Sequence, residues 1–144
     1  MTTPPAAGYE RRMPTAFESL SRLPLFSRLS GRQVRKIAKR TNEHHFEADE
    51  VIVRQGGKTR SLYVILEGEA KIVRDGRTIA RRRPGDFFGE ISMIDLRPRV
   101  ASVVADSSMR CLVLPHEALR DLVISDPGVA WSLLQTVASR LWED

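Results

Sequence analysis

The segment 87–103 brings together residue types that suit the binding of an anion and a hydroxyl group. Gly89 lets the chain turn sharply and approach a ligand closely. A helical turn starting at Glu90 would expose free backbone N–H groups, and such groups form an anion site. Arg99 follows the stiffening Pro98 and carries a fork of donors suited to a phosphate. Because an anion repels a carboxylate, Glu90 indicates a ligand that also offers a hydroxyl, such as a ribose next to a phosphate.

A purely structural interpretation of the same residues remains open at this point. The spacing also fits a turn closed by a salt bridge between Glu90 and Arg99, with no ligand involved. Spacing alone does not separate these two interpretations.

Other reactive residue types form no catalytic or metal-binding pattern. Of the three histidines, His44 and His45 are adjacent, so on a strand they point to opposite faces, and His116 lies far along the chain. A cupin-type enzyme on a similar β-roll needs histidines and a carboxylate on inward-facing positions. Cys111 has no histidine nearby in sequence and suits a small core position. We therefore expect that the chain has no catalytic residue and no metal ligand, and that it is not an enzyme.

The elements that position this segment are predicted to be short strands. Between residues 43 and 114, apolar stretches alternate with turns, and Asp75-Gly76 is a dipeptide that favours a two-residue hairpin. The expected strands cover 51–53, 62–66, 70–73, 77–80, 100–105 and 109–114. Six to eight strands at this spacing predict a sandwich, barrel or jelly roll.

Helical periodicity flanks the strands on both sides. Residues 15–23 predict a short amphipathic helix that Pro24 ends, and Ser30 with Gln33 predicts a capping box at the start of a second helix. Two more helices are expected over 115–125 and 128–141. The last helix has two apolar stripes, formed by Ala130, Leu133, Val137 and Leu141 and by Trp131, Leu134, Ala138 and Trp142.

A surface helix normally needs one buried face. We expect the first stripe of the last helix to cover the β-roll. The second stripe predicts either contact with another molecule, such as a second copy in a homodimer, or wide burial in the chain's own core.

Composition sets further limits. The 144 residues, 42% of them hydrophobic, suit one domain, and the net charge of +5 fits either an anionic ligand or a solvated surface. Arg81, Arg82 and Arg83 are interpreted as a solvated strand terminus. Residues 1–14 are expected to be a flexible leader without a secretory signal, and no apolar run suits a membrane span. The single cysteine fits a cytoplasmic location.

The run F-G-E-I-S-M-I-D-L-R-P-R-V-A-S-V resembles the phosphate-binding cassette of cyclic nucleotide-binding domains, such as those of the protein kinase A regulatory subunit and the catabolite activator family. Pro84-Gly85-Asp86 before it, and the order of the closing helices, also resemble the family. The resemblance implies a mainly β double-stranded β-helix, a jelly-roll-like β-roll, with N-terminal helices and two C-terminal helices. The domain would cover residues 15–144.

The resemblance also implies a role for each cassette residue. Glu90 would accept a hydrogen bond from the ribose 2′-OH, and Arg99 would pair with the cyclic phosphate. The backbone N–H groups of Ile91 and Ser92 would donate to phosphate oxygens, with Gly89 permitting the close approach.

Val100 would pack beside the phosphate and offer only its N–H. Because related cGMP sites often place a hydroxyl residue at this position, the resemblance favours cAMP over cGMP. The implied function is a cyclic-nucleotide sensor whose C-terminal helices move on binding and act on an effector protein that the sequence does not identify.

Two other functions fit the resemblance. One is a nucleotide-free protein-interaction module. The other is the sensor part of a transcription regulator, whose helix-turn-helix module we do not expect within the 144 residues given.

Overall fold

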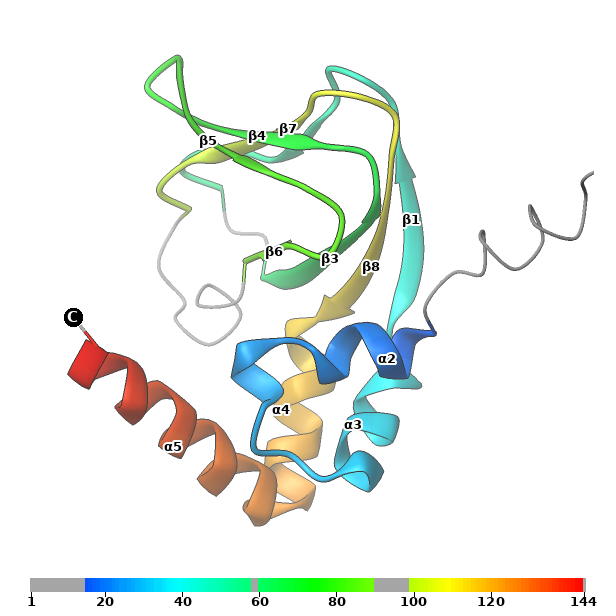
Figure 1. Ribbon diagram of the computed structural model, residues 1–144, viewed down its shortest axis with the longest axis vertical. Coiled ribbons are helices and arrows are strands. Elements are labelled where there is room, and N and C mark those ends of the chain that lie inside the picture. The colour runs from blue at the N-terminus through cyan, green and yellow to red at the C-terminus, as the bar shows by residue number, and fades with distance from the viewer. Residues whose placement is uncertain (1–14, 58–59, 90–98, 144) are drawn as a thin grey trace, which may run out of the picture.

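The computed structural model describes residues 15–57, 60–89 and 99–143, so the predicted leader 1–14 lies outside the described residues. Within them, eight strands form two antiparallel four-stranded sheets, with helices gathered at one end (Figure 1). The first sheet has the order β1 (Asn42–Phe46), β8 (Met109–Pro115), β3 (Ser61–Glu67) and β6 (Phe87–Phe88). The second has the order β2 (Val51–Val53), β7 (Ser102–Ala105), β4 (Ala70–Arg74) and β5 (Arg77–Arg82). The predicted jelly-roll-like β-roll is confirmed.

The turn between β4 and β5 has the backbone that its sequence favours. Asp75 and Gly76 have φ angles of 52° and 80°, and a two-residue hairpin of type I′ requires positive φ at both positions. The strand β5 continues through Arg82, two residues beyond the predicted end, and β6 was not predicted.

The central strand β3 is buried on both faces. Leu62 and Val64 point toward the helices and join one apolar cluster, whereas Tyr63 and Ile65 point into the roll and join a second. This explains why the strand reads as a continuous apolar run rather than an alternating one. The second cluster is the interior of the roll, where the candidate site lies.

The N-terminal helices begin at capping boxes. They are α2 (Ala16–Ser21), the 3₁₀-helix η1 (Pro24–Phe26) and α3 (Gly31–Ala38). Before α3, the Gln33 backbone N–H donates to Ser30 Oγ at 3.2 Å, and the Ser30 N–H donates to the Gln33 side chain at 2.9 Å. The predicted capping box is therefore confirmed, and a second one joins Thr15 and Glu18.

The C-terminal helices are α4 (His116–Ser125) and α5 (Pro127–Glu143). The described core residues of α5 include Val129 and Leu133, and α5 packs mainly against η1 and α4 rather than directly on the sheets as we expected. The side chains of Val137, Leu141 and Trp142 lie outside the description. On the second predicted stripe, Trp131 and Leu134 are 65% and 60% exposed.

Among the described residues, no helix has both the length and the apolar character that crossing a bilayer requires.

Candidate ligand-binding site

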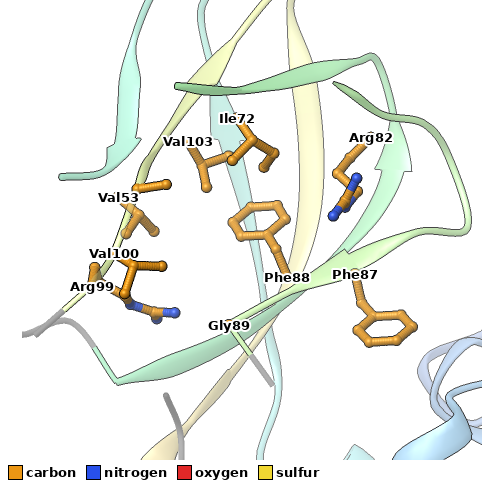
Figure 2. Close-up of a pocket in the computed structure, with 10 residues that line it drawn as sticks. Val53, Ile72, Arg82, Phe87, Phe88, Gly89, Arg99, Val100 and Val103 are labelled. Carbon is orange, nitrogen blue, oxygen red and sulfur yellow. The ribbon is translucent and has the colours of Figure 1, made fainter. Parts of the chain in front are cut away.

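A pocket of about 380 Å³ opens into the roll between the two sheets (Figure 2). Its size lies within the range of about 300 to 1,000 Å³ that is usual for small-molecule sites. Apolar side chains form most of its walls, and two arginines join them. The described lining consists of Val53, Ile72, Arg82, Phe87, Phe88, Gly89, Arg99, Val100, Ala101 and Val103.

Arg99 is held firmly at one side of this pocket. Its backbone N–H donates to the Gly57 carbonyl at 3.0 Å, and its carbonyl accepts from the Gly56 N–H at 2.7 Å. Its Nη2 donates to the Ser61 carbonyl at 3.0 Å, and the residue is only 8% exposed. The turn after β2 and the start of β3 therefore fix the guanidinium in place.

Gly89 passes close to this guanidinium, and it must be a glycine. Its φ is +89°, a conformation that L side chains rarely adopt. A Cβ at this position would overlap the Ser61 carbonyl oxygen and lie 3.0 Å from both terminal nitrogens of Arg99. The absent side chain leaves the backbone free to approach whatever the guanidinium binds.

Burial shapes the electrostatics of this side of the pocket. It lowers the pKa of Arg99, and the nearby Tyr63 opposes part of that shift. Burial also raises the pKa of the Tyr63 hydroxyl, while Arg99 acts in the opposite direction. Because a guanidinium is not deprotonated in proteins, Arg99 remains a cation in a largely apolar setting. Such a group attracts an anion more strongly than an exposed one does.

Arg82 is a site residue that the sequence interpretation missed. Arg81 and Arg83 are exposed, as expected of a solvated strand terminus, but Arg82 is half-buried and lines the pocket. The interpretation of this run was therefore wrong for Arg82. The signal that could have found it is the period of two along β5, which places Arg82 on the same face as the half-buried Ala80.

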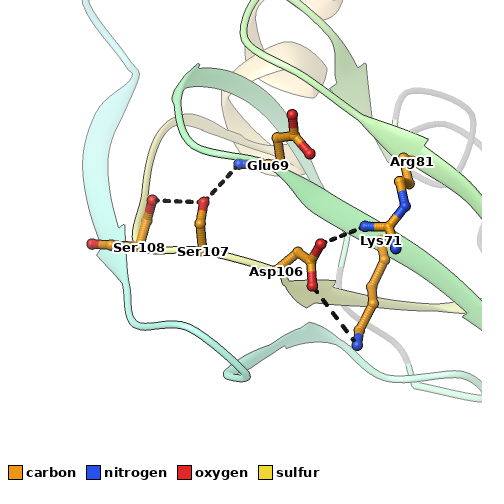
Figure 3. Close-up of polar contacts among 6 residues, drawn as sticks. All are labelled: Glu69, Lys71, Arg81, Asp106, Ser107 and Ser108. Carbon is orange, nitrogen blue, oxygen red and sulfur yellow. Dashed lines mark hydrogen bonds and ion pairs between the residues drawn. The ribbon is translucent and has the colours of Figure 1, made fainter.

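The arginine next to it has a different environment. Arg81 forms an ion pair with Asp106, which also lies 3.9 Å from the Lys71 ammonium (Figure 3). This small charge cluster is partly exposed and does not line the pocket. Arg81 and Arg82 are adjacent in sequence, but Arg81 pairs with Asp106 whereas Arg82 lines the pocket.

The structure brings together three of the six predicted site residues. Gly89, Arg99 and Val100 line one pocket, and Val100 is 74% exposed. Predicted residues Glu90, Ile91 and Ser92 lie outside the described residues.

Two residues of nucleophilic type outside the pocket, Cys111 and Ser107, have structural roles. Burial raises the pKa of the Cys111 thiol to about 12, which keeps it protonated and unreactive. Ser107 Oγ accepts from the Glu69 N–H at 3.0 Å and donates to the Ser108 carbonyl at 3.2 Å, which holds a turn (Figure 3). No cluster of potential metal ligands occurs among the described residues.

Comparison with known proteins places these features in a family. The sequence profile of the cyclic nucleotide-binding domain matches residues 43–126. A CRP-like cAMP-activated global transcriptional regulator of Mycobacterium tuberculosis is 29% identical over 86% of this chain. The chain spans 58% of that regulator's length and 24–30% of the length of other curated relatives.

Solved structures agree with the fold. The N-terminal domain of a transcriptional regulator from Streptomyces coelicolor superposes with a TM-score of 0.79 at 32% identity, covering 87% of this chain and 93% of that one. The regulatory subunit of a cAMP-independent protein kinase A from Trypanosoma cruzi, bound to guanosine, has a TM-score of 0.72 at 27% identity, covering 78% and 40%. The chain belongs to the cyclic nucleotide-binding domain family, whose members are regulatory ligand-binding domains.

Proposed function

We propose that this chain senses a cyclic nucleotide, with cAMP as the ligand, and does not catalyse a reaction. The observation that carries the proposal is the buried Arg99 guanidinium beside the Gly89 backbone, at the side of an apolar pocket of about 380 Å³. A cyclic nucleotide has the matching parts, because it joins one phosphate charge to a flat, largely apolar base.

In the proposed complex, the cyclic phosphate pairs with the Arg99 guanidinium and the base lies against the apolar walls. Glu90 accepts from the ribose 2′-OH, and the backbone N–H groups of Ile91 and Ser92 complete the phosphate site. Val100 adds its N–H and no hydroxyl, which removes one contact that a cGMP site often uses. The name of the Mycobacterium tuberculosis relative, a cAMP-activated regulator, supports the same ligand.

Calorimetric titration of the protein tests the ligand directly. We expect cAMP to bind far more tightly than 5′-AMP, whose phosphate carries an additional charge and is not cyclic, and than 2′-deoxy-cAMP, which lacks the hydroxyl that Glu90 reads. Guanosine belongs in the series because the Trypanosoma cruzi protein was solved with it. Equal binding of cAMP and 2′-deoxy-cAMP would reject the role of Glu90. No binding of any nucleotide would favour the interaction-module alternative.

The output of the sensor is proposed to be a population shift of α4 and α5. A ligand shifts such an equilibrium only through a difference in its affinity for the two helix positions. The similarity to transcription regulators supports a role as a regulator's sensor part, with the effector still to be identified.

The exposed stripe of α5 supports a homodimer as the signalling unit. Trp131 and Leu134 are more than half exposed, and burying an aromatic and an aliphatic side chain against a second copy would stabilise a dimer. We expect Trp131→Glu to give a monomer in sedimentation velocity, while Arg77→Glu, at an exposed position on β5, leaves the dimer intact. A wild type that stays monomeric at high micromolar concentration would reject this assembly.

A further inference from the structure

A further pocket, of about 210 Å³, lies outside the roll between α2 and β3, and we call it the helix-side pocket. It is on the face of β3 that carries Val64, which packs against the helices, and not on the face that lines the roll. Its described lining consists of Ser19, Arg22, Val64, Ile65, Leu66, Pro84 and Gly85. The two pockets share no described lining residue, so a site here does not depend on the proposed nucleotide site.

The helix-side pocket is lined by a buried serine whose hydroxyl has no hydrogen-bond partner among the described residues. The buried polar residues in the described part of the chain are Ser19, Arg99 and Thr136. Thr136 Oγ1 donates to the Ser132 carbonyl at 3.1 Å, and Arg99 donates to the Ser61 carbonyl. Ser19 is only 7% exposed, yet its hydroxyl makes no such contact. Because a buried polar group without a partner is costly, a ligand that hydrogen-bonds to Ser19 would stabilise the site.

A cation lies on the same side of α2. Ser19 and Arg22 are three positions apart, which places them on one face at the end of the helix. Arg22 is exposed and forms no ion pair with any described residue. A guanidinium and a hydroxyl thus lie next to each other at this pocket, and both can donate hydrogen bonds to an anion.

The remaining walls of the helix-side pocket are mainly aliphatic, and they come from Val64, Leu66 and Pro84. The register of β3 against β8 shifts between Ile65 and Glu67, so Leu66 lies at a bulge. Bulges re-aim side chains and are frequent beside functional sites. The Gly85 N–H donates to the Ile65 carbonyl at 2.8 Å, which fixes the wall, and a Cβ on Gly85 would meet no atom within 4 Å. The backbone therefore leaves room beside Gly85.

We propose that the helix-side pocket binds a small aliphatic carboxylic acid. A carboxylate has two oxygens, so it can accept from the Arg22 guanidinium and from the Ser19 hydroxyl together. The alkyl chain lies along the aliphatic walls, where it is removed from water. The volume of about 210 Å³ is below the range of about 300 to 1,000 Å³ that is usual for drug-sized ligands, so the acid must be small.

The test is a titration of the protein with acetate, butyrate and hexanoate at constant ionic strength, followed by amide shifts in a ¹⁵N spectrum. We expect saturable shifts at Leu66 and Gly85, which line the helix-side pocket. Each methylene that enters the aliphatic part should strengthen binding about fourfold. The neutral 1-hexanol carries the same chain without the charge and should bind more weakly than hexanoate.

Three variants assign the binding to the named groups. Ser19→Leu fills the pocket and should abolish the saturable shifts. Arg22→Ala should weaken hexanoate binding about 1.5- to 5-fold, the range for an exposed charge pair, and should leave 1-hexanol binding unchanged. The matched control, Arg32→Ala, changes an exposed arginine of α3 that does not line the pocket, and it should change neither affinity. Should Ser19→Leu fail to fold, Ser19→Ala removes only the hydroxyl and should weaken hexanoate binding about 2- to 12-fold.

Four results would overturn the inference. Shifts that grow linearly with hexanoate through the millimolar range would show that no site exists. Equal affinities for hexanoate and 1-hexanol would reject the role of the carboxylate. An equal loss of hexanoate binding in Arg22→Ala and Arg32→Ala would mean a general attraction to the basic helices. Saturable shifts confined to Gly89 and Arg99 would place the acid in the pocket of the roll instead.

Discussion

The interior of the β-roll has two regions with different contents. One, the packed interior, holds Ala70, Ala105, Met109 and Cys111, each at most 1% exposed. The other, the pocket, is lined by apolar walls together with Arg82 and Arg99. A roll of this size can be filled by apolar side chains alone, as the packed interior is. The two arginines distinguish the pocket from the packed interior, and in the proposed complex Arg99 pairs with the phosphate.

Two stacked aromatic rings lie between these regions. The Tyr63 and Phe88 rings are 4.8 Å apart and nearly parallel. The pKa of Tyr63 responds to Arg99 on the pocket side and to Cys111 on the packed side. Phe88 directly precedes Gly89, so the stack also fixes the strand that delivers this glycine to the pocket.

The largest expected effect concerns the pocket. Removing one member of a partly buried charge pair costs about 2 to 5 kcal/mol, so Arg99→Ala should weaken cAMP binding roughly 30- to 4,000-fold. Arg99→Lys should recover part of this loss, because an ammonium cannot reproduce the bidentate fork. The exposed Arg83→Ala is the matched control and should change the dissociation constant little. Calorimetry measures all three, and wild-type affinity in Arg99→Ala would mean that the cassette is not the binding site.

A substitution in the packed interior should lower the stability of the protein and leave its affinity for cAMP nearly unchanged. Truncating a buried methionine removes apolar contacts and leaves a cavity, so Met109→Ala should lower the free energy of unfolding by about 2 to 5 kcal/mol. Denaturant titration measures this loss. At a temperature where the variant is folded, its affinity for cAMP should stay within about threefold of the wild type. A selective loss of binding in the folded variant would break the distinction between the two regions.

Much of this arrangement could be predicted from the sequence. The hairpin at Asp75-Gly76 and the cap at Ser30 follow from local rules, since each depends on residues a few positions apart. The cassette pattern identified Gly89 and Arg99 as neighbours of one site. Arg82 was missed because a run of three arginines reads as a solvated terminus, and only the continuation of β5 into the pocket assigns the middle one to the inward face.

A smaller expected effect is a pH dependence of stability that comes from Cys111 in the packed interior. Burial raises the pKa of Cys111 to about 12 from its ordinary 9.0, so the folded protein keeps a proton that the unfolded thiol loses. This contribution to stability is complete below pH 9 and is lost as the pH rises toward 12, at up to about 1.4 kcal/mol per pH unit. Melting temperatures between pH 8 and 10.5 should fall less steeply for Cys111→Ala than for the wild type. Parallel slopes would show that the thiol is not the group responsible.

The central claim is that the pocket, and not the packed interior, receives the nucleotide. Amide chemical shifts in a ¹⁵N spectrum, recorded during a cAMP titration, report on both regions in one experiment. We predict large saturable shifts at Gly89 and Arg99, which line the pocket, and at Gly56, whose N–H donates to the Arg99 carbonyl. Much smaller shifts are expected at Ala105 and Cys111. Shifts of similar size in both regions, or shifts confined to the helices, would contradict the account.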